Sequence, residues 1–369
     1  MSSPTPFVFK WGIVSTGGIA TKYVSDLLVD PKTRDVHDVA HKIVAVGSRS
    51  VAKAQDFIDA KINGDKNIKA YGSYDDLYAD PNVDGVYIGT PHTFHYANAI
   101  DALKAKKHVL CEKPVTSNAA ELRALIAAAK ENGVFFMEAL WTRFQPLSLE
   151  IKQVAYSGEL GLPIALHADL SEDFDIENIP TTHRMLDPML GGGALLDLGP
   201  YPLIWATMLL FEHPANEGKQ PSNITGSLLK TPRTGVDSSA AFTLTFDAAK
   251  LRAQAHLTCS MNVRPADGVI VRFERGTIRI PQPIWRPKSF TVEYTDAKGE
   301  VVKQEERKKE YVGVGWHFQA DEVARCVRDG KTESEQWGHE KSILEMTIFD
   351  EVRKQGGYVF PPGVEKVTQ

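Results

Sequence analysis

Cysteine is scarce in this sequence, which has only Cys111, Cys259 and Cys326 among its 369 residues. The three are odd in number and far apart, so they support neither a disulfide framework nor a CxxC metal site. We therefore expect reduced, buried thiols and a cytoplasmic protein.

An excess of positive charge and long apolar runs are also missing. The chain has 42 Lys and Arg against 47 Asp and Glu, giving a net charge of −5. Nucleic acids and anionic membranes attract clustered Lys and Arg, so we expect neither partner. The N-terminal stretch does not resemble a signal peptide, and we identify no stretch long enough to span a bilayer.

Histidines at helical spacing are present, but they are too few for a metal site. His37 and His41 are four residues apart, and His92 and His95 are three apart. A zinc site needs three or four ligands. We expect the group around His37 to lie in a solvated loop, and we expect no metal.

The chain is ordinary in composition but long. It is 43% hydrophobic and 24% charged, as in a soluble globular protein. A chain of 369 residues exceeds what one hydrophobic core usually serves, so two domains are expected.

Residues 1–140 alternate between strand and helix patterns. The strands are nearly all apolar, which is typical of a parallel sheet covered on both faces by helices. We predict a doubly wound α/β domain. Its strands are expected at 7–14, 43–47, 83–89, 108–111 and 134–137, and its helices at 21–28, 51–60, 95–106 and 118–132.

Residues 141–369 have a different texture. From Gly226 the strand patterns alternate between apolar and polar residues, which favours a mostly antiparallel, open sheet with one buried face. Two amphipathic helices are expected at about 318–328 and 340–354. We predict an α+β domain for substrate binding and oligomerisation.

The turn between the first strand and the first helix resembles a dinucleotide fingerprint. Gly17 and Ala20 occupy the second and third small positions, and Ser15 replaces the first glycine. The helix N-terminus would offer free amides to a phosphate. The expected cofactor contacts here are Thr16, Gly17, Gly18 and Ile19.

The second strand ends in Gly47-Ser48-Arg49-Ser50. NAD-binding proteins usually carry an acid here, whereas NADP-binding proteins carry Arg and small hydroxyls for the 2′-phosphate. Because a guanidinium flanked by two hydroxyls suits a phosphate, we predict NADP, bound through Ser48, Arg49 and Ser50.

Polar residues follow two later strands, where ligands bind to such a sheet. Thr90-Pro91-His92 and Glu112-Lys113 stand at these ends, and we expect all five to contact the cofactor. Pro114 restricts Lys113 to an extended backbone and so would help to aim it.

Four motifs in order make the chain similar to the glucose-fructose oxidoreductase/inositol dehydrogenase family. Within it, the chain resembles the branch of dimeric dihydrodiol dehydrogenases and fungal NADP-dependent D-xylose dehydrogenases. The motifs are GIVSTGGIA (12–20), CEKP (111–114), MEALWTRF (137–144) and GGGALLDLGPY (191–201).

The resemblance implies an N-terminal Rossmann domain and a C-terminal sheet that often forms a homodimer. It implies that Lys113 and Tyr201 are the catalytic pair and that Asp197 lies beside the substrate. It also places His95, Trp141 and Arg143 in or near the cleft, the last two among the cofactor contacts. We expect His95 to be either a substrate-side hydrogen-bond donor or a residue that starts a helix. The loop 171–186, which includes the predicted substrate residue His183, matches poorly, and this leaves the substrate open.

The implied reaction is oxidation of the C1 hydroxyl of a pyranose to a lactone. Tyr201 is our candidate base, and a cationic Lys113 nearby would lower its pKa from about 10. Lys113 itself is the alternative proton acceptor. Asp197 lies four residues before Tyr201, so a helical segment would place both on one face.

Three functions compete. The first is an NADP-dependent sugar dehydrogenase, with D-xylose as the best candidate. The second is a trans-dihydrodiol dehydrogenase or dicarbonyl reductase of the same fold. The third is a regulator that senses NADP without catalysis, which would need neither Lys113 nor Tyr201.

Overall fold

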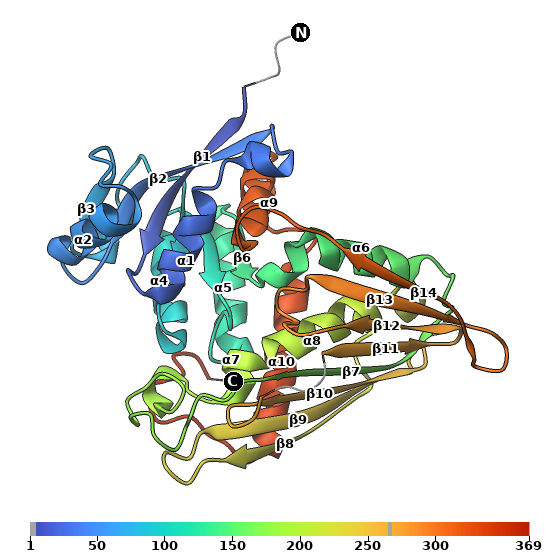
Figure 1. Ribbon diagram of the computed structural model, residues 1–369. Coiled ribbons are helices and arrows are strands. Elements are labelled where there is room, and N and C mark those ends of the chain that lie inside the picture. The colour runs from blue at the N-terminus through green and yellow to red at the C-terminus, as the bar shows by residue number, and fades with distance from the viewer. Residues whose placement is uncertain (1–4, 265–267, 369) are drawn as a thin grey trace. The chain divides into compact units, whose positions relative to one another are not determined.

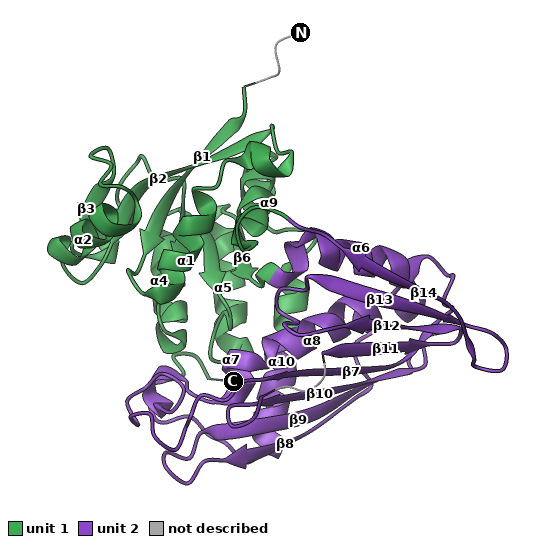
Figure 2. Cartoon of the chain, in the orientation of Figure 1, with its two compact units in different colours: residues 1–141, 311–343, 365–369 green, residues 142–310, 344–364 purple. Residues whose placement is uncertain are grey.

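The computed structural model describes residues 5–264 and 268–368, and the chain forms two compact units (Figure 2). Unit 1 comprises Met1–Trp141, Tyr311–Ile343 and Glu365–Gln369, and unit 2 comprises Thr142–Glu310 and Leu344–Val364. The first crossing lies one residue from the boundary expected at 140/141. The later segments of unit 1 correct the prediction that everything after residue 140 belongs to the second domain.

Unit 1 contains the expected parallel sheet, of which Figure 1 labels β1, β2, β3 and β6. Its six strands follow the order β3-β2-β1-β4-β5-β6. The order reverses at β1, so the carboxyl ends of β1 and β4 flank the switch point at which such sheets bind ligands. The strands are β1 (Phe7–Val14), β2 (Val39–Gly47), β3 (Lys69–Tyr71), β4 (Gly85–Ile88), β5 (His108–Glu112) and β6 (Phe136–Ala139).

Helices separate these strands, and most lie within a few residues of their predicted bounds. The short elements β3 and α3 were not predicted. The helices of unit 1 are α1 (Gly18–Leu27), α2 (Val51–Lys61), α3 (Tyr74–Tyr78), α4 (His95–Lys104), α5 (Ala119–Asn132) and α9 (Trp316–Arg328).

Buried carboxylates explain why α9 belongs to unit 1. Asp26 of α1 accepts hydrogen bonds from the backbone N–H groups of 314–316, at 2.6–2.8 Å, and so caps the start of α9. Asp321 of α9 accepts hydrogen bonds from Arg34 Nε and Nη2, both at 2.7 Å, and its Oδ1 lies 2.9 Å from His41 Nε2. His41 therefore belongs to β2 and has a buried side chain, and the prediction of a solvated loop is wrong for it.

Unit 2 contains an eight-stranded sheet in the order β14-β13-β12-β11-β7-β10-β9-β8. Only the β7–β10 pair is parallel, so the prediction of a mostly antiparallel sheet is confirmed. The strands are β7 (Pro163–Ser171), β8 (Asn223–Lys230), β9 (Asp237–Phe246), β10 (Ala253–Ser260), β11 (Val269–Phe273), β12 (Gly276–Ile280), β13 (Ser289–Thr295) and β14 (Val301–Lys308).

Buried and more exposed positions alternate along the central strands β9 and β10, because helices cover one face of this sheet. The short helices α7 (Ala194–Leu198) and α8 (Pro200–Ala206) pack against β7, β9 and β10. Helix α6 (Pro146–Tyr156) follows the crossing into unit 2, and α10 (His339–Gln355) begins in unit 1 and continues in unit 2.

Among the described residues, one helical run, Pro188–Phe211, is long and apolar enough to cross a membrane. Within its most apolar window, 94% is buried inside the protein. The expectation that no stretch is long enough is therefore wrong by length and composition alone, and the place of this run in the core of unit 2 explains both.

Candidate active site

The turn after β1 has the features of a phosphate-binding loop. Ser15 has φ of +98°, a conformation that glycine adopts more easily, which explains why the fingerprint normally has Gly there. A Cβ at Gly18 would meet no atom within 4 Å, and one at Gly17 would meet only Ser15 Oγ at 3.4 Å. Helix α1 begins at Gly18 without a side-chain cap. The open space at Gly17 and Gly18 therefore lies next to backbone N–H groups of the first turn that no side chain caps. A dinucleotide pyrophosphate fits this place.

The carboxyl end of β2 lies beside that turn. Thr16 Oγ1 and Ser48 Oγ are 3.2 Å apart, which joins the ends of β1 and β2. Ser50 caps α2 by accepting the Lys53 N–H at 3.3 Å, and Arg49 between the two serines is exposed. The Arg49 guanidinium thus lies at the start of α2, where a phosphate would be stabilised by both the cation and the helix N-terminus.

Lys113 directly follows β5 and is partly exposed. The bond from Lys113 to Pro114 is cis. The backbone beyond it is anchored on two sides, because Pro114 O lies 2.8 Å from His95 Nδ1 and the Val115 N–H donates to Glu138 Oε1 at 3.1 Å. Lys113 therefore extends from a backbone with fixed partners.

His95 is fully buried between two backbone carbonyls. Its ring nitrogens lie 2.8 Å from Thr90 O and from Pro114 O. Burial lowers the pKa of His95 to about 4, so the ring is neutral near pH 7 and donates to one carbonyl at a time. It joins the loops after β4 and β5, and its predicted substrate contact stays a prediction.

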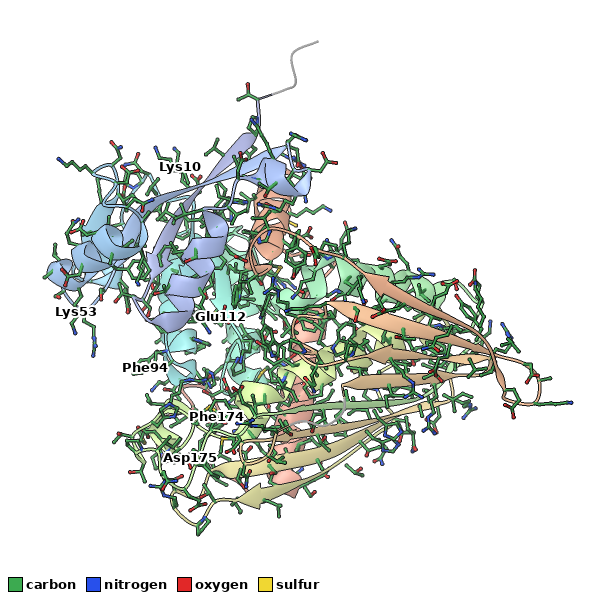
Figure 3. The ribbon with its side chains drawn as sticks, in the orientation of Figure 1. Lys10, Lys53, Phe94, Glu112, Phe174 and Asp175 are labelled. Carbon is green, nitrogen blue, oxygen red and sulfur yellow. The ribbon has the colours of Figure 1, made fainter. Side chains whose placement is uncertain are left out.

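Glu112 is buried at the end of β5, where Figure 3 labels it. Its Oε1 accepts the Tyr87 hydroxyl at 2.8 Å, and the Tyr87 ring stacks on Tyr23 at 3.7 Å. Burial raises the pKa of Glu112 to about 7. The carboxyl is thus engaged inside unit 1, next in sequence to Lys113.

In unit 2, Asp237 of β9 holds the start of α7. Its Oδ2 accepts the Leu195 N–H at 2.6 Å. Gly193 before the helix has φ of +124°, and a Cβ there would lie 2.2 Å from Asp237 Oδ1. Glycine is therefore required, and the GGG motif is explained by a carboxylate packed against it.

Asp197 and Tyr201 stand on one nearly continuous helical path. Gly199, between α7 and α8, keeps helical angles, and its N–H and C=O continue the hydrogen bonding. The condition for Asp197 and Tyr201 to share a face is thus met. Asp197 is buried, and Tyr201 is partly exposed.

Arg184 is a residue that the sequence analysis missed. Its Nη1 donates to Asp197 Oδ1 at 2.9 Å, and its side chain is 51% exposed. Asp197 is the first cause of a raised pKa of Arg184, and the nearby Tyr201 contributes. No recognised motif covers the loop that carries it; its position next to His183 is the only signal. Phe174 and Asp175, labelled in Figure 3, lie in the same loop.

Three other predicted residues have partners within their own units. Trp141 stacks on Trp316 of α9 at 4.3 Å, and Arg143 Nη2 donates to Glu212, which also binds Lys152. His183 Nδ1 accepts the Met185 N–H at 3.3 Å. Their contacts with cofactor or substrate remain predictions, as do those of Ile19, Pro91 and His92. Lys113 belongs to unit 1 and Tyr201 to unit 2.

The turn after β1 and the residues at the strand ends have the features of a dinucleotide-binding protein. The model described as "Oxidoreductase family, NAD-binding Rossmann fold" matches residues 9–140, and the GFO/IDH/MocA C-terminal domain matches residues 148–279. The chain belongs to the GFO/IDH/MocA family of oxidoreductases.

Relatives match over nearly the whole chain. D-xylose 1-dehydrogenase (NADP(+)) from Hypocrea jecorina is 39% identical, covering 98% of this chain and 95% of the relative. Trans-1,2-dihydrobenzene-1,2-diol dehydrogenase from Danio rerio is 35% identical, covering 95% and 98%. The structure of an aldose-aldose oxidoreductase from Caulobacter crescentus, complexed with glycerol, has a TM-score of 0.77 at 22% identity, covering 95% and 97%. That structure shows that the fold is shared.

Proposed function

We propose that this protein is an NADP-dependent dehydrogenase that oxidises an aldopyranose, best D-xylose, at C1 to the lactone. The observation that carries the proposal is the similarity to a fungal D-xylose 1-dehydrogenase (NADP(+)) over 98% of the chain. The geometry of both units is compatible with this proposal. Unit 1 holds the predicted cofactor site and Lys113, and unit 2 holds Asp197 and Tyr201.

The choice of NADP is supported by the end of β2. Ser48, Arg49 and Ser50 offer a cation and two hydroxyls, and residues 47–50 contain no acid for a ribose diol. The turn at Gly17 and Gly18 would hold the pyrophosphate. When bound, the nicotinamide supplies the hydride acceptor, and the protein supplies orientation and charge.

The catalytic groups would handle the proton of the sugar hydroxyl. As hydride leaves C1, the O1 proton passes to the Tyr201 phenolate or to neutral Lys113, and the C1–O1 bond becomes the lactone carbonyl. A cation beside Tyr201 favours its phenolate form. Within unit 2, Arg184 is such a cation, and its Nη1 also donates to the Asp197 carboxylate.

A trans-dihydrodiol is the second candidate substrate, and the vertebrate relative at 35% identity favours it. A sugar has more hydroxyls to satisfy than a diol, so its site needs more polar groups. The charged pair of Arg184 and Asp197 beside Tyr201 favours the sugar.

The test is NADPH formation with D-xylose, D-glucose and a trans-dihydrodiol, each with NADP and with NAD. We expect turnover of a sugar with NADP, and a loss of about a hundredfold or more in Tyr201→Phe. Turnover of the diol alone would show that the protein is a trans-dihydrodiol dehydrogenase, the second candidate. NADP binding without any turnover would support a sensor and contradict both.

We further propose that the protein is a cytoplasmic homodimer that pairs through the open face of the eight-stranded sheet. The three cysteines are free and buried, as suits a reducing compartment. The uncovered sheet face includes Ile164, which is 50% exposed, and the partly exposed Ile270.

A further inference from the structure

The loop 113–118, which begins with Lys113, is held by buried side chains of unit 1. Each of three backbone groups in it has a side-chain partner. These are Pro114 O with His95 at 2.8 Å, Val115 N with Glu138 at 3.1 Å, and Ser117 N with Glu121 at 2.9 Å. The loop is thus built to keep one conformation.

Asn118, at the end of this loop, is bonded on both sides of its amide. Its Oδ1 accepts the Glu121 N–H at 2.8 Å and caps α5, as the sequence predicts. Its Nδ2 donates to Glu365 Oε1 and to Val367 O, both at 2.8 Å. The second pair of bonds joins the loop to a segment almost 250 positions away.

The two carboxylate oxygens of Glu121 accept hydrogen bonds from the same two segments, the 113–118 loop and residues 365–367. Oε2 accepts the Ser117 N–H, and Oε1 accepts the Lys366 N–H at 2.6 Å. Glu121 is 1% exposed, so water cannot replace a lost donor cheaply. In an ordinary capping box this carboxylate returns only to the start of its own helix.

We propose that residues 365–367 form a clamp that positions Lys113 for hydride transfer by holding the 113–118 loop through Asn118 and Glu121. The clamp belongs to unit 1 although it follows a stretch of unit 2 in sequence. It supplies three of the hydrogen bonds of Asn118 and Glu121. The effect of the clamp on kcat rests on the proposed function, in which Lys113 acts on the sugar or its proton.

Loss of the clamp leaves Glu121 with fewer donors in a buried place. Burial already raises the pKa of Glu121, and the Lys366 N–H is the first cause that opposes the rise. Without it, the carboxyl would bind a proton more readily, and its bond to the Ser117 N–H would weaken. The loop would then lose two constraints at once: the anchor at the Ser117 N–H and the hydrogen bonds from Asn118 to residues 365 and 367.

The first test compares a chain ending at Val364 with a control ending at Val367. We expect the shorter chain to lose roughly tenfold in kcat for the sugar, since small misplacements of catalytic groups have large effects. The control, which keeps all three clamp bonds, should stay within about twofold. Amide hydrogen exchange of residues 115–118 should accelerate only in the shorter chain.

The second test is a double-mutant cycle that keeps the chain length. Asn118→Asp retains the cap of α5 but opposes the Glu365 carboxylate. Asn118→Asp with Glu365→Gln lets a glutamine donate to the new carboxylate. We expect the single Asn118→Asp change to lower kcat and the added Glu365→Gln change to restore it at least about threefold. The same order should appear in the exchange of residues 115–118.

Unchanged exchange and unchanged kcat in the chain ending at Val364 would overturn the clamp. So would equal losses in the single and double variants, which would show that Asn118 acts on α5 alone. If the wild-type protein turns over no substrate, the proposed function fails. The hydrogen-exchange comparison of the two shortened chains then still decides whether the clamp holds the loop.

Discussion

Arg49 is the residue on which cofactor choice is expected to depend. Its exposed guanidinium lies between Ser48 and the cap residue Ser50, so a 2′-phosphate would gain a charge-assisted hydrogen bond. Such bonds contribute about 1.5–3 kcal/mol, or roughly 10–150-fold in affinity. We expect Arg49→Ala to raise KM for NADP by that factor and to leave KM for NAD unchanged.

Steady-state kinetics with both cofactors check this prediction. Arg328→Ala is a matched control, because Arg328 is also an exposed arginine of unit 1, and it is paired with Asp38 and Asp329. An equal rise in KM for NADP and NAD would assign Arg49 to the fold instead of to the phosphate.

Arg184 is expected to affect the sugar rather than the cofactor. Its removal takes a cation away from Asp197 and Tyr201, so the phenolate becomes less favourable. Because the Arg184 side chain is 51% exposed, solvent screens the pair and the effect should be moderate. For Arg184→Leu we expect roughly a three- to tenfold loss of kcat/KM for the sugar, with its acidic limb shifted to higher pH.

The pH profile of kcat/KM measures this shift, and Arg184→Lys should recover part of it. High salt should reduce the difference between wild type and Arg184→Leu. A lower kcat/KM with an unmoved profile would mean that Arg184 only shapes the loop.

At the scale of elements, the start of α7 depends on the buried carboxyl of Asp237. Burial raises its pKa to about 7, well above the value of 3.8 expected in the unfolded chain. A raised pKa in the folded state means that folding binds a proton. This stabilisation is complete below about pH 4 and is lost as the pH rises through about 7.

We therefore expect the free energy of unfolding to contain a part, on the order of a few kcal/mol, that decreases from about pH 4 to about pH 8. Asp237→Asn should remove that part, because an amide binds no proton in this pH range but still offers an oxygen to the Leu195 N–H. Urea unfolding across pH checks this. The exposed Asp247→Asn is the control, and an unchanged pH dependence in Asp237→Asn would contradict the prediction.

At the scale of the whole molecule, the open face of the eight-stranded sheet is the surface to test for assembly. One row across it runs from Thr243 through His256 and His167 to Ile270, and the two histidine rings stack at 4.8 Å. We expect a homodimer in sedimentation experiments. Ile270→Arg should shift it toward monomer, because facing copies would bury a new charge.

The control for this experiment is Leu28→Arg, a change at an exposed position directly after α1 in unit 1. A wild-type protein that sediments as a monomer at micromolar concentration would exclude the dimer. A dimer unaffected by Ile270→Arg would place the interface elsewhere.

Much of the N-terminal architecture was predictable from local patterns in the sequence. The apolar runs of β1, β4 and β5 and the cap of α5 at Asn118 are signals within about ten residues, so periodicity and side-chain chemistry reveal them. The two short elements β3 and α3 carry too few residues for a pattern. The site residues of the four motifs could be named, whereas Arg184 could not.

The sequence by itself determined the parallel sheet, the phosphate-binding turn and the candidate residues Lys113, Asp197 and Tyr201. Only the tertiary structure decided which distant segments complete unit 1 and which groups the buried carboxylates bind. Asp26 accepts hydrogen bonds from the start of α9, and Glu121 accepts one from the Lys366 N–H. The physical reason is that turns and helices follow from neighbours in sequence, whereas a buried charge takes whichever donor the fold brings to it.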